Sequence, residues 1–263
     1  MEKRAFVGLI AARAVASAAL TVVLLGGANQ VRAAEIRVLS AASMQTVFKE
    51  ILGDFERASG HKVIVAYSTM GAITNRVMRG EEIDLVISSP ASISSLVRQG
   101  RIAAGSEVTV SRTGVGIVVP SGTPRLRIES IEDFKRALLA AKTVVYADPA
   151  GGGAAGIHFA RVIGKLGMTE QLKPKTRFAA GGDVTEVTLA QGAGALGMTQ
   201  VSEIVGKPGA DFVPIPDELQ NFTGFTAAIP AGAKQSEAVT AFIRFLQSPA
   251  AVAVMKAKGM QAN

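Results

Sequence analysis

Hydrophobic positions along the chain alternate between two periods. Short apolar or β-branched runs, typical of buried strands, lie at 36–40, 62–68, 83–89, 114–120, 143–147 and 195–199. Helical spacing of apolar residues predicts helices at 44–58, 72–79, 92–99, 130–141, 154–167, 183–191, 236–247 and 249–258, and the segments 212–215 and 222–230 are expected to be extended. Strands separated by helices of this length predict an α/β fold with mainly parallel sheets and helices on both faces.

Two of these helices begin with capping signals. Ser130 stands three residues before Asp133, where its hydroxyl can accept a hydrogen bond from a free N–H group of the first turn. Asp183 and Glu186 have the spacing of a capping box.

Residues 1–33 have the pattern of a secretory signal peptide. Lys3 and Arg4 precede an uncharged, mostly apolar stretch at 14–28, and Val31 and Ala33 stand at the −3 and −1 positions of a cleavage site. The apolar stretch is shorter than the roughly 20 residues that a membrane span needs, which favours cleavage over a retained anchor. We therefore expect residues 34–263 to be free in the periplasm.

The formal charge changes when this segment is removed. Lys3, Arg4, Arg13 and Arg32 leave together with Glu2, so the net charge falls from +7 to +4. The remaining basic residues are scattered and are not interleaved with aromatic residues. We expect no nucleic-acid partner.

The scarcity of cysteine and histidine limits the possible chemistry. The chain has no cysteine, which excludes disulfides, thiolate metal sites, a cysteine nucleophile and a lipid-modified cysteine. His61 and His158 are the only histidines, so a three-histidine metal site is impossible. We expect neither a metal nor a cofactor.

Four loops that lead from a strand into a helix share one composition. They are 40–44 (SAASM), 67–73 (YSTMGAI), 148–156 (DPAGGGAAG) and 179–186 (AAGGDVTE), all rich in Ser, Thr, Gly or Ala and free of Lys and Arg. The first turn of a helix has unpaired N–H groups and the positive end of the helix dipole. Helix capping alone explains any single loop, but four such loops favour an anion site at the carboxyl ends of the strands.

The third loop matches G-x-G-x-x-G at Gly151, Gly153 and Gly156, yet its surroundings do not fit a nucleotide-binding loop. The segment 148–150 separates the motif from the preceding strand, and the next acidic residue, Glu170, does not follow a second strand. The positions of the Walker A Lys and Ser or Thr are also filled by other residue types. We therefore expect no nucleotide.

Six motifs occur in an order that resembles the periplasmic molybdate-binding proteins of ABC transporters. They are VLSAASM (38–44), GEEIDLVISSP (80–90), GIVVPSGTP (116–124), ADPAGGGAAGIHFARVIGKLGM (147–168), GALGMTQVSEI (194–204) and FIRFLQSPAAVAVMKAKGM (242–260). The resemblance covers residues 35–260.

The resemblance implies a type II periplasmic binding protein. In this fold two lobes, each a mainly parallel sheet flanked by helices, are joined by two crossings and close around a ligand by hinge motion. We place the crossings near Pro120–Pro124 and Pro216–Gln220. Lobe one is then 34–120 plus 218–263, and lobe two is 121–217.

The resemblance also implies a set of ligand-binding residues. In that family, hydroxyl groups and backbone N–H groups hold a tetrahedral oxyanion in the cleft. By position, the corresponding residues are Ser43, Ser68, Thr69, Gly71, Gly153, Ala154, Ala155, Asp183, Val184 and Gln200, the last where the best-known members have a tyrosine.

The loops also depart from the family pattern. Met70 replaces a hydroxyl residue, and the third loop is longer and richer in glycine. These departures, together with His158 one turn into the following helix, would suit a larger anion such as a small carboxylate. We therefore add His158 to the candidate ligand contacts.

These inferences predict a monomeric, non-enzymatic solute-binding protein. It would deliver a small anion, a molybdate- or tungstate-like oxyanion, to the permease of an ABC transporter in the inner membrane. Three alternatives stay open: the same fold binding a small organic carboxylate, a sensory module of that fold, and an exported hydrolase that uses Ser43 or Ser68. The hydrolase lacks a G-x-S-x-G or S-x-x-K motif at a suitable loop. Sugars are disfavoured because the chain has no tryptophan and two tyrosines.

Overall fold

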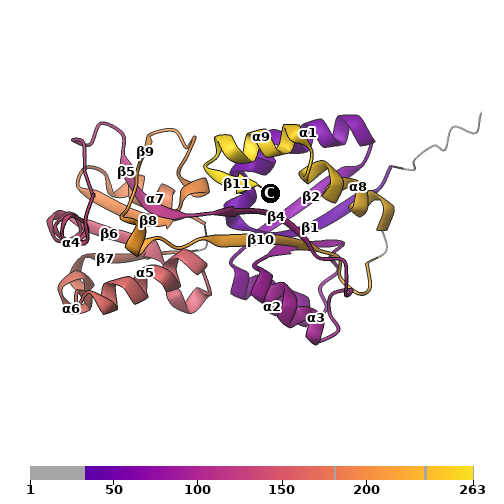
Figure 1. The fold of residues 1–263 in the computed structure, drawn as a ribbon, viewed down its shortest axis with the longest axis horizontal. Helices are drawn as coiled ribbons and strands as arrows, with labels where there is room; N and C mark the ends of the chain where they lie inside the picture. The colour runs from indigo at the N-terminus through magenta and orange to yellow at the C-terminus, as the bar shows by residue number, and fades with distance from the viewer. Residues whose placement is uncertain (1–32, 181, 234–235, 263) are drawn as a thin grey trace, which may run out of the picture. The chain divides into compact units, whose positions relative to one another are not determined.

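The computed structural model describes residues 33–180, 182–233 and 236–262 (Figure 1). The signal peptide expected at the N-terminus lies outside these residues. Within them, no single helix is long and apolar enough to cross a membrane.

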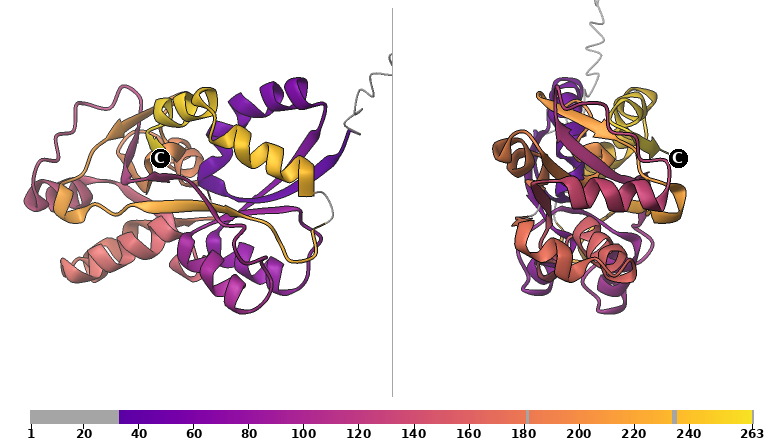
Figure 2. Two further views of the ribbon diagram at one scale, coloured as in Figure 1. Left: turned by 45° about the vertical axis from the view of Figure 1, so that its right-hand side comes forward. Right: turned by 90° about the vertical axis from the view of Figure 1, so that its left-hand side faces the viewer.

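The first sheet has six strands among the described residues, in the order β11-β4-β10-β3-β1-β2. Its strands are β1 (Glu35–Ala41), β2 (Lys62–Ser68), β3 (Leu85–Ser88), β4 (Val108–Thr113), β10 (Thr223–Ala228) and β11 (Met260–Ala262). Its helices are α1 (Gln45–Ser59), α2 (Met70–Met78), α3 (Pro90–Arg98), α8 (Ser236–Leu246) and α9 (Pro249–Ala257). Figures 1 and 2 show α1, α8 and α9 on one face of this sheet and α2 and α3 on the other.

The second sheet has five strands in the described part of the chain, in the order β7-β6-β8-β5-β9. Its strands are β5 (Val115–Pro120), β6 (Thr143–Ala147), β7 (Thr176–Ala179), β8 (Ala195–Gln200) and β9 (Ala210–Val213). Its helices are α4 (Ile131–Ala140), α5 (Ala154–Lys165), α6 (Thr169–Leu172) and α7 (Val184–Gln191). Short 3₁₀ turns follow several strands: η1 (Ala42–Met44), η2 (Pro149–Gly151) and η4 (Val201–Glu203), with η5 (Asp217–Leu219) after β9.

Each sheet has its own hydrophobic core, as two lobes require. Phe48, Phe225 and Phe242 are fully buried in the core of the first sheet. Phe134 and Phe159 are fully buried in the core of the second.

The strand pairing corrects one part of the expectation, because both sheets are mixed rather than mainly parallel. β1 pairs in parallel with β2 and β3, and β6 pairs in parallel with β7 and β8. The antiparallel pairs are β3–β10, β4–β10, β4–β11, β5–β8 and β5–β9. Each of them includes β4, β5 or β10, the strands on which the chain leaves one sheet or returns to it.

The chain passes between the sheets at two places. Gly114 alone separates β4 of the first sheet from β5 of the second, so the strand 115–120, which we assigned to lobe one, pairs in the second sheet. The chain returns along the segment 214–222. Gln220 joins the two passages, since its Oε1 accepts from Val115 N at 2.7 Å and its Nε2 donates to Val115 O at 3.1 Å.

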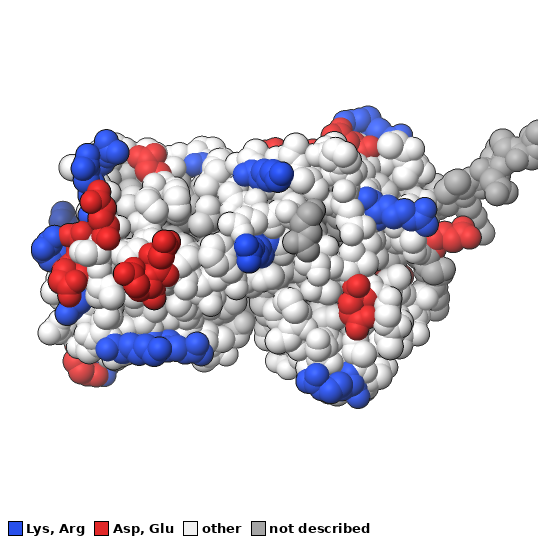
Figure 3. Space-filling model, viewed as in Figure 1, with Lys and Arg blue, Asp and Glu red and all other residues white. Residues whose placement is uncertain are grey.

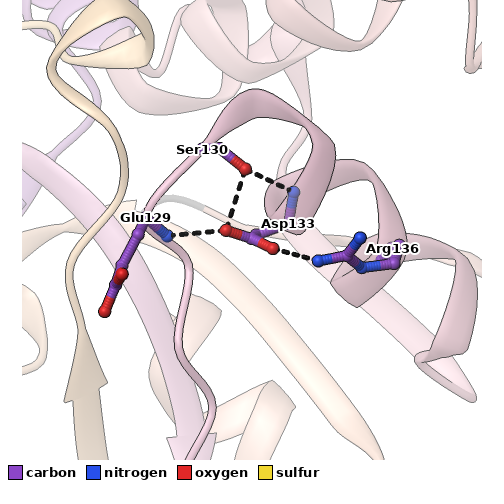
Figure 4. A network of polar contacts seen from close by, with 4 residues as sticks. All are labelled: Glu129, Ser130, Asp133 and Arg136. Atoms are coloured by element: carbon purple, nitrogen blue, oxygen red, sulfur yellow. Dashed lines mark hydrogen bonds and ion pairs between the residues drawn. The ribbon is translucent and has the colours of Figure 1, made fainter.

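The predicted start of α4 is confirmed. Ser130 Oγ accepts from Asp133 N at 3.1 Å and donates to Asp133 Oδ2 at 2.8 Å (Figure 4). Glu129 N also donates to Asp133, and Arg136 pairs with it from the next turn. Led by the Ser130 hydroxyl, these groups hold the pKa of the Asp133 carboxyl below its usual value.

The capping box at 183–186 is not formed. Asp183 precedes α7, but its side chain makes no capping hydrogen bond. Its backbone has φ −90° and ψ 9° rather than the extended angles of a capping residue, so the carboxylate does not reach the first turn.

Candidate functional site

A small cavity lies where the loops of the two sheets meet. From the first sheet it is lined by Ala41, Ala42, Ser43, Ser68, Thr69 and Met70, and from the second by Ala147, Gly153, Ala154, Ala155, Thr199, Gln200 and Glu203. None of these lining residues is a lysine or an arginine. The cavity volume is about 30 Å³, by a measure in which one water molecule needs about 10–15 Å³. It therefore has room for a ligand of a few atoms.

Strand register brings these loops together. β1 and β2 are parallel with Ala41 opposite Ser68, so the loops that follow both strands begin at the same edge of the first sheet. β6 and β8 are parallel with Tyr146 opposite Met198, which places Ala147 beside Thr199. The carboxyl ends of parallel strands thus form both walls of the cavity, as the sequence predicted.

The N-terminus of α5 brings backbone donors to the cavity. Gly153 is the residue before the helix and has no side chain to cap it, and Ala154 and Ala155 in its first turn line the cavity. The first N–H groups of a helix have no partner within the helix. They carry the partial positive charge of the helix dipole, so this end of α5 suits an anion.

Glu203 is an acidic residue in the cavity wall that the sequence analysis missed. It ends η4 and is 9% exposed. Ser43 Oγ donates to its Oε1 at 2.8 Å, and Thr199 Oγ1 donates to its Oε2. Ser43 Oγ also contacts the side-chain amide of Gln200. A hydroxyl has only one proton to donate, so Glu203 and Gln200 compete for the Ser43 proton before any ligand arrives.

Burial raises the pKa of the Glu203 carboxyl above its ordinary value. Loss of hydration disfavours the charged form, and this effect outweighs the hydrogen bonds from Thr199 and Ser43, which favour it. Lys207 lowers the pKa and Glu186 raises it, and these two residues form an ion pair with each other. The shift favours the protonated carboxylic acid over the carboxylate at this position.

Direct contacts between the two sheets surround the cavity. Thr69 Oγ1 donates to Gly151 O at 2.6 Å, and Gly71 N donates to Gly152 O at 3.4 Å. Thr46 Oγ1 donates to Ser202 O at 2.8 Å on another side. The described structure is therefore a closed arrangement in which both walls touch.

The glycines of the third loop serve these close approaches. A Cβ on Gly156 would lie 2.1 Å from Ala147 O, so only glycine lets α5 pack this closely on the end of β6. Gly152 has φ +72° and lies against Gly71, where a Cβ would be 2.9 Å from Gly71 Cα. Backbone packing accounts for two glycines of this loop without a phosphate.

Most of the expected ligand residues meet at the cavity. Ser43, Ser68, Thr69, Gly153, Ala154, Ala155 and Gln200 line it. Gly71 lies just outside, against Gly152, and neither Asp183 nor the buried Val184 is among the lining residues. His158 Nε2 lies 2.8 Å from Leu219 O and is also absent from the lining.

Thr199 and Glu203 could have been found from the sequence. Thr199 ends the predicted strand 195–199, and Glu203 follows it. The four candidate loops were selected because they follow predicted strands in the same way. Glu203 was passed over because an acidic side chain contradicts the expected chemistry of an anion site.

The family of bacterial extracellular solute-binding proteins matches residues 36–261. The chain belongs to this family. Among characterised relatives, it is 29% identical over 233 residues to an aconitate isomerase from a Pseudomonas species, covering 86% of this chain and 87% of that protein. It is 28% identical over 233 residues to the molybdate-binding protein ModA of Azotobacter vinelandii, covering 87% and 90%.

Solved structures of solute-binding proteins share the fold of this family member. The periplasmic molybdate-binding protein of Azotobacter vinelandii aligns with a TM-score of 0.74 at 20% identity, over 87% of this chain and 99% of that one. The sulfate-binding protein SubI of Mycobacterium tuberculosis aligns with a TM-score of 0.68 at 18% identity, over 87% of each chain. PEB3 bound to L-phospholactate aligns with a TM-score of 0.65 at 16% identity, over 87% and 100%. The two-lobe type II fold and the relationship to molybdate-binding proteins are thereby confirmed.

Proposed function

We propose that this family member is a periplasmic binding protein that captures a small anion between its lobes and passes it to the permease of an ABC transporter. The observation that carries the proposal is the cavity itself. It brings the uncapped N-terminus of α5 together with the hydroxyl-bearing Ser43, Ser68 and Thr69, and among the described residues neither lysine nor arginine lines it. Backbone N–H groups and hydroxyls hold an anion by directed hydrogen bonds, which strengthen when the lobes close and exclude water.

The lobes in this proposal are defined by the sheets. We place the crossings at Gly114 and at 214–222, so that lobe one holds the first sheet and lobe two the second. Closure then brings the loops after β1 and β2 against the loops after β6 and β8.

The ligand class follows from the size and polarity of the cavity. A volume of about 30 Å³ suits a tetrahedral oxyanion or the carboxylate end of a small organic acid. Two relatives are named as molybdate-binding proteins, which supports the oxyanion.

A thermal-shift screen tests this function. The full chain is expressed, and the exported protein is unfolded and refolded to remove carried-over ligand. Molybdate, tungstate, sulfate, phosphate and small mono-, di- and tricarboxylates are then added. A ligand at 100 times its dissociation constant stabilises the protein by about 2.7 kcal/mol, which gives a clear rise in Tm. No shift with any of these anions would reject the proposal.

The location of the protein is tested on the same preparation. The signal peptide predicts that periplasmic protein begins at Ala34, which intact mass measures directly. A mass that includes residues 1–33, or protein retained with the membranes, would contradict export with cleavage.

A second candidate function is isomerisation of a small polycarboxylate. Glu203 favours it, since a buried carboxyl with a raised pKa can accept or return a proton on a bound ligand. One relative is named aconitate isomerase. Incubation with trans-aconitate, followed by NMR for cis-aconitate, tests this activity, and Glu203→Gln is expected to abolish it. Unchanged substrate with the wild-type protein would exclude it.

The serine hydrolase gains no support from the described residues. Ser43 is bonded to Glu203 and Gln200 rather than to a histidine. His61 Nδ1 accepts from Ala34 N, and His158 is held at Leu219. A nucleic-acid partner gains none either, because basic and acidic side chains are interspersed on the face shown in Figure 3.

A further inference from the structure

Glu203 stands in a place that its charge makes unfavourable for an anion site. It belongs to the wall of the same cavity as the α5 N-terminus, and it is bonded to two other lining residues, Ser43 and Thr199. An anion that takes a hydrogen bond from Ser43 must therefore lie close to this carboxyl group.

Within the part of the chain that the structure describes, the surroundings of Glu203 do not supply an unpaired positive charge. From β8 and η1 it meets the hydroxyls of Thr199 and Ser43, and from α7 the Thr185 hydroxyl donates to its backbone oxygen at 2.8 Å. The charged groups that act on it are Lys207 and Glu186, and these neutralise each other in an ion pair. The charge of Lys207 is thus already paired with a carboxylate.

Two negative charges in contact inside a cavity of low dielectric constant repel strongly, so both groups do not stay ionised together. Aspartate pairs that share one site behave in this way and hold a single proton between them. The same rule applies when one member of the pair is a bound ligand.

We propose that Glu203 makes this a site for an anion together with a proton, which the carboxyl group and the bound anion share. The inference rests on the proposed function, since it specifies how that cavity holds its anion. An anion that carries a proton of its own, such as hydrogen phosphate, donates it to ionised Glu203. A fully deprotonated anion, such as molybdate, sulfate or oxalate, binds only when Glu203 takes a proton from solvent and donates it to the ligand.

This arrangement makes affinity depend on pH in a defined direction. Each deprotonated anion that binds to ionised Glu203 takes up one proton from solution. Its dissociation constant then rises about tenfold per pH unit above the pKa of Glu203 in the free protein, and is constant below that pKa. Burial, which raises that pKa, moves the change of slope toward neutral pH.

Isothermal titration calorimetry with molybdate, sulfate and oxalate tests the inference between about pH 6 and pH 9. Three forms of the full exported protein are compared: wild type, Glu203→Gln and Glu170→Gln. Glu203→Gln keeps the shape of the side chain and always offers an N–H donor, so its affinity is expected to be independent of pH. Glu170→Gln is the matched control, because Glu170 is exposed on α6 and lies outside the lining, and it is expected to keep the wild-type slope.

Proton uptake by the wild-type protein gives a second reading that needs no variant. Titrations in buffers with different ionisation enthalpies are expected to show close to one proton taken up per anion at the alkaline end. Wild-type affinity that is flat across the whole range, or a slope that persists in Glu203→Gln, overturns this inference alone. Failure of these three anions, and of every other anion in the thermal-shift panel, to bind any form overturns the proposed function and the inference with it.

Discussion

Ser43 has a single hydroxyl proton, and three groups compete for it. Glu203 and the Gln200 amide contact it in the closed structure, and an anion in the cavity would need it as well. The sequence predicts Ser43 from its place after a buried strand. It does not predict the competition, because Glu203 lies 160 residues away and reaches the serine only when the two lobes meet.

Ser43→Ala is expected to weaken anion binding by about 1–3 kcal/mol, since the ligand loses a charge-assisted donor. It is also expected to lower the free energy of unfolding by about 1 kcal/mol, because buried Glu203 loses one of its hydrogen bonds. Calorimetry and chemical denaturation measure the two effects. Ser121→Ala, which removes a hydroxyl bonded to Asp211 on the surface, serves as control. Unchanged affinity would show that the Ser43 hydroxyl bonds Glu203 and Gln200 without holding the anion.

Glu203 gives the stability of the protein a pH dependence of predictable sign. Its pKa is raised on folding, so the native state binds the proton more tightly than the unfolded state does. Stability contributed by this group is present at low pH, falls as pH rises from about 4.5, the ordinary value, through the raised pKa, and levels off above it. Thermal unfolding of wild type and Glu203→Gln across this range measures the difference. Equal slopes for both proteins would contradict the assignment.

At the scale of elements, the predictable parts of the fold are those whose own pattern carries the signal. The apolar runs at β1, β2, β3, β5, β6 and β8 and the helices with one apolar face follow from the sequence alone. β4, β7, β11 and α6 were missed. β7 and β11 are short edge strands. β4 is a polar segment in which buried and exposed positions do not alternate regularly, since the neighbours Val110 and Ser111 are both buried. Such strands are fixed by their partners rather than by their own pattern.

The candidate site is likewise predictable from the sequence only in part. Loops at strand ends are visible in the sequence, and seven of the expected ligand residues line the cavity. The position of the crossings is not visible, since no residue pattern around Gly114 marks the change from the first sheet to the second. His158 also could not be placed, because its partner is a backbone oxygen of a distant segment.

The contact between α2 and the glycine loop is expected to control closure. A Cβ on Gly71 would lie 3.1 Å from Gly152 Cα, which requires a shift of a few tenths of an ångström, so Gly71→Ala is expected to disturb the contact between the two walls. We expect weaker anion binding and a larger radius of gyration by X-ray scattering in the presence of ligand. Gly164→Ala, inside α5 with open space around it, is the control. It is expected to stabilise the protein by about 0.5–1 kcal/mol without changing affinity. Wild-type affinity and compactness for Gly71→Ala would show that closure does not use this contact.

At the scale of the whole molecule, the two passages between the sheets are joined by one side chain. Gln220, on the returning segment, bonds both the N–H and the C=O of Val115, directly after Gly114. These two hydrogen bonds hold the two passages together at Val115 and Gln220. We therefore expect the lobes to rotate about an axis that passes close to these residues.

Gln220→Ala is expected to weaken the connection between the two passages. The Val115 amide loses its acceptor, so its hydrogen exchange, measured by mass spectrometry of the spanning peptide, becomes faster. Because the open states become more varied, closure costs more entropy and anion affinity falls severalfold. Gln99→Ala, which removes an exposed side chain bonded within α3, is the control. Unaltered exchange at Val115 would show that the β5 pairing alone holds this segment.

The position of His158 on α5 links the cavity to the returning passage between the sheets. The helix begins at the cavity with Ala154 and Ala155, and one turn later His158 Nε2 meets the carbonyl oxygen of Leu219, next to Gln220. A helical turn is stiff, so we expect an anion that binds the first N–H groups of α5 to shift the Leu219 carbonyl as well. Binding in the cavity would then reach the returning crossing through one turn of helix.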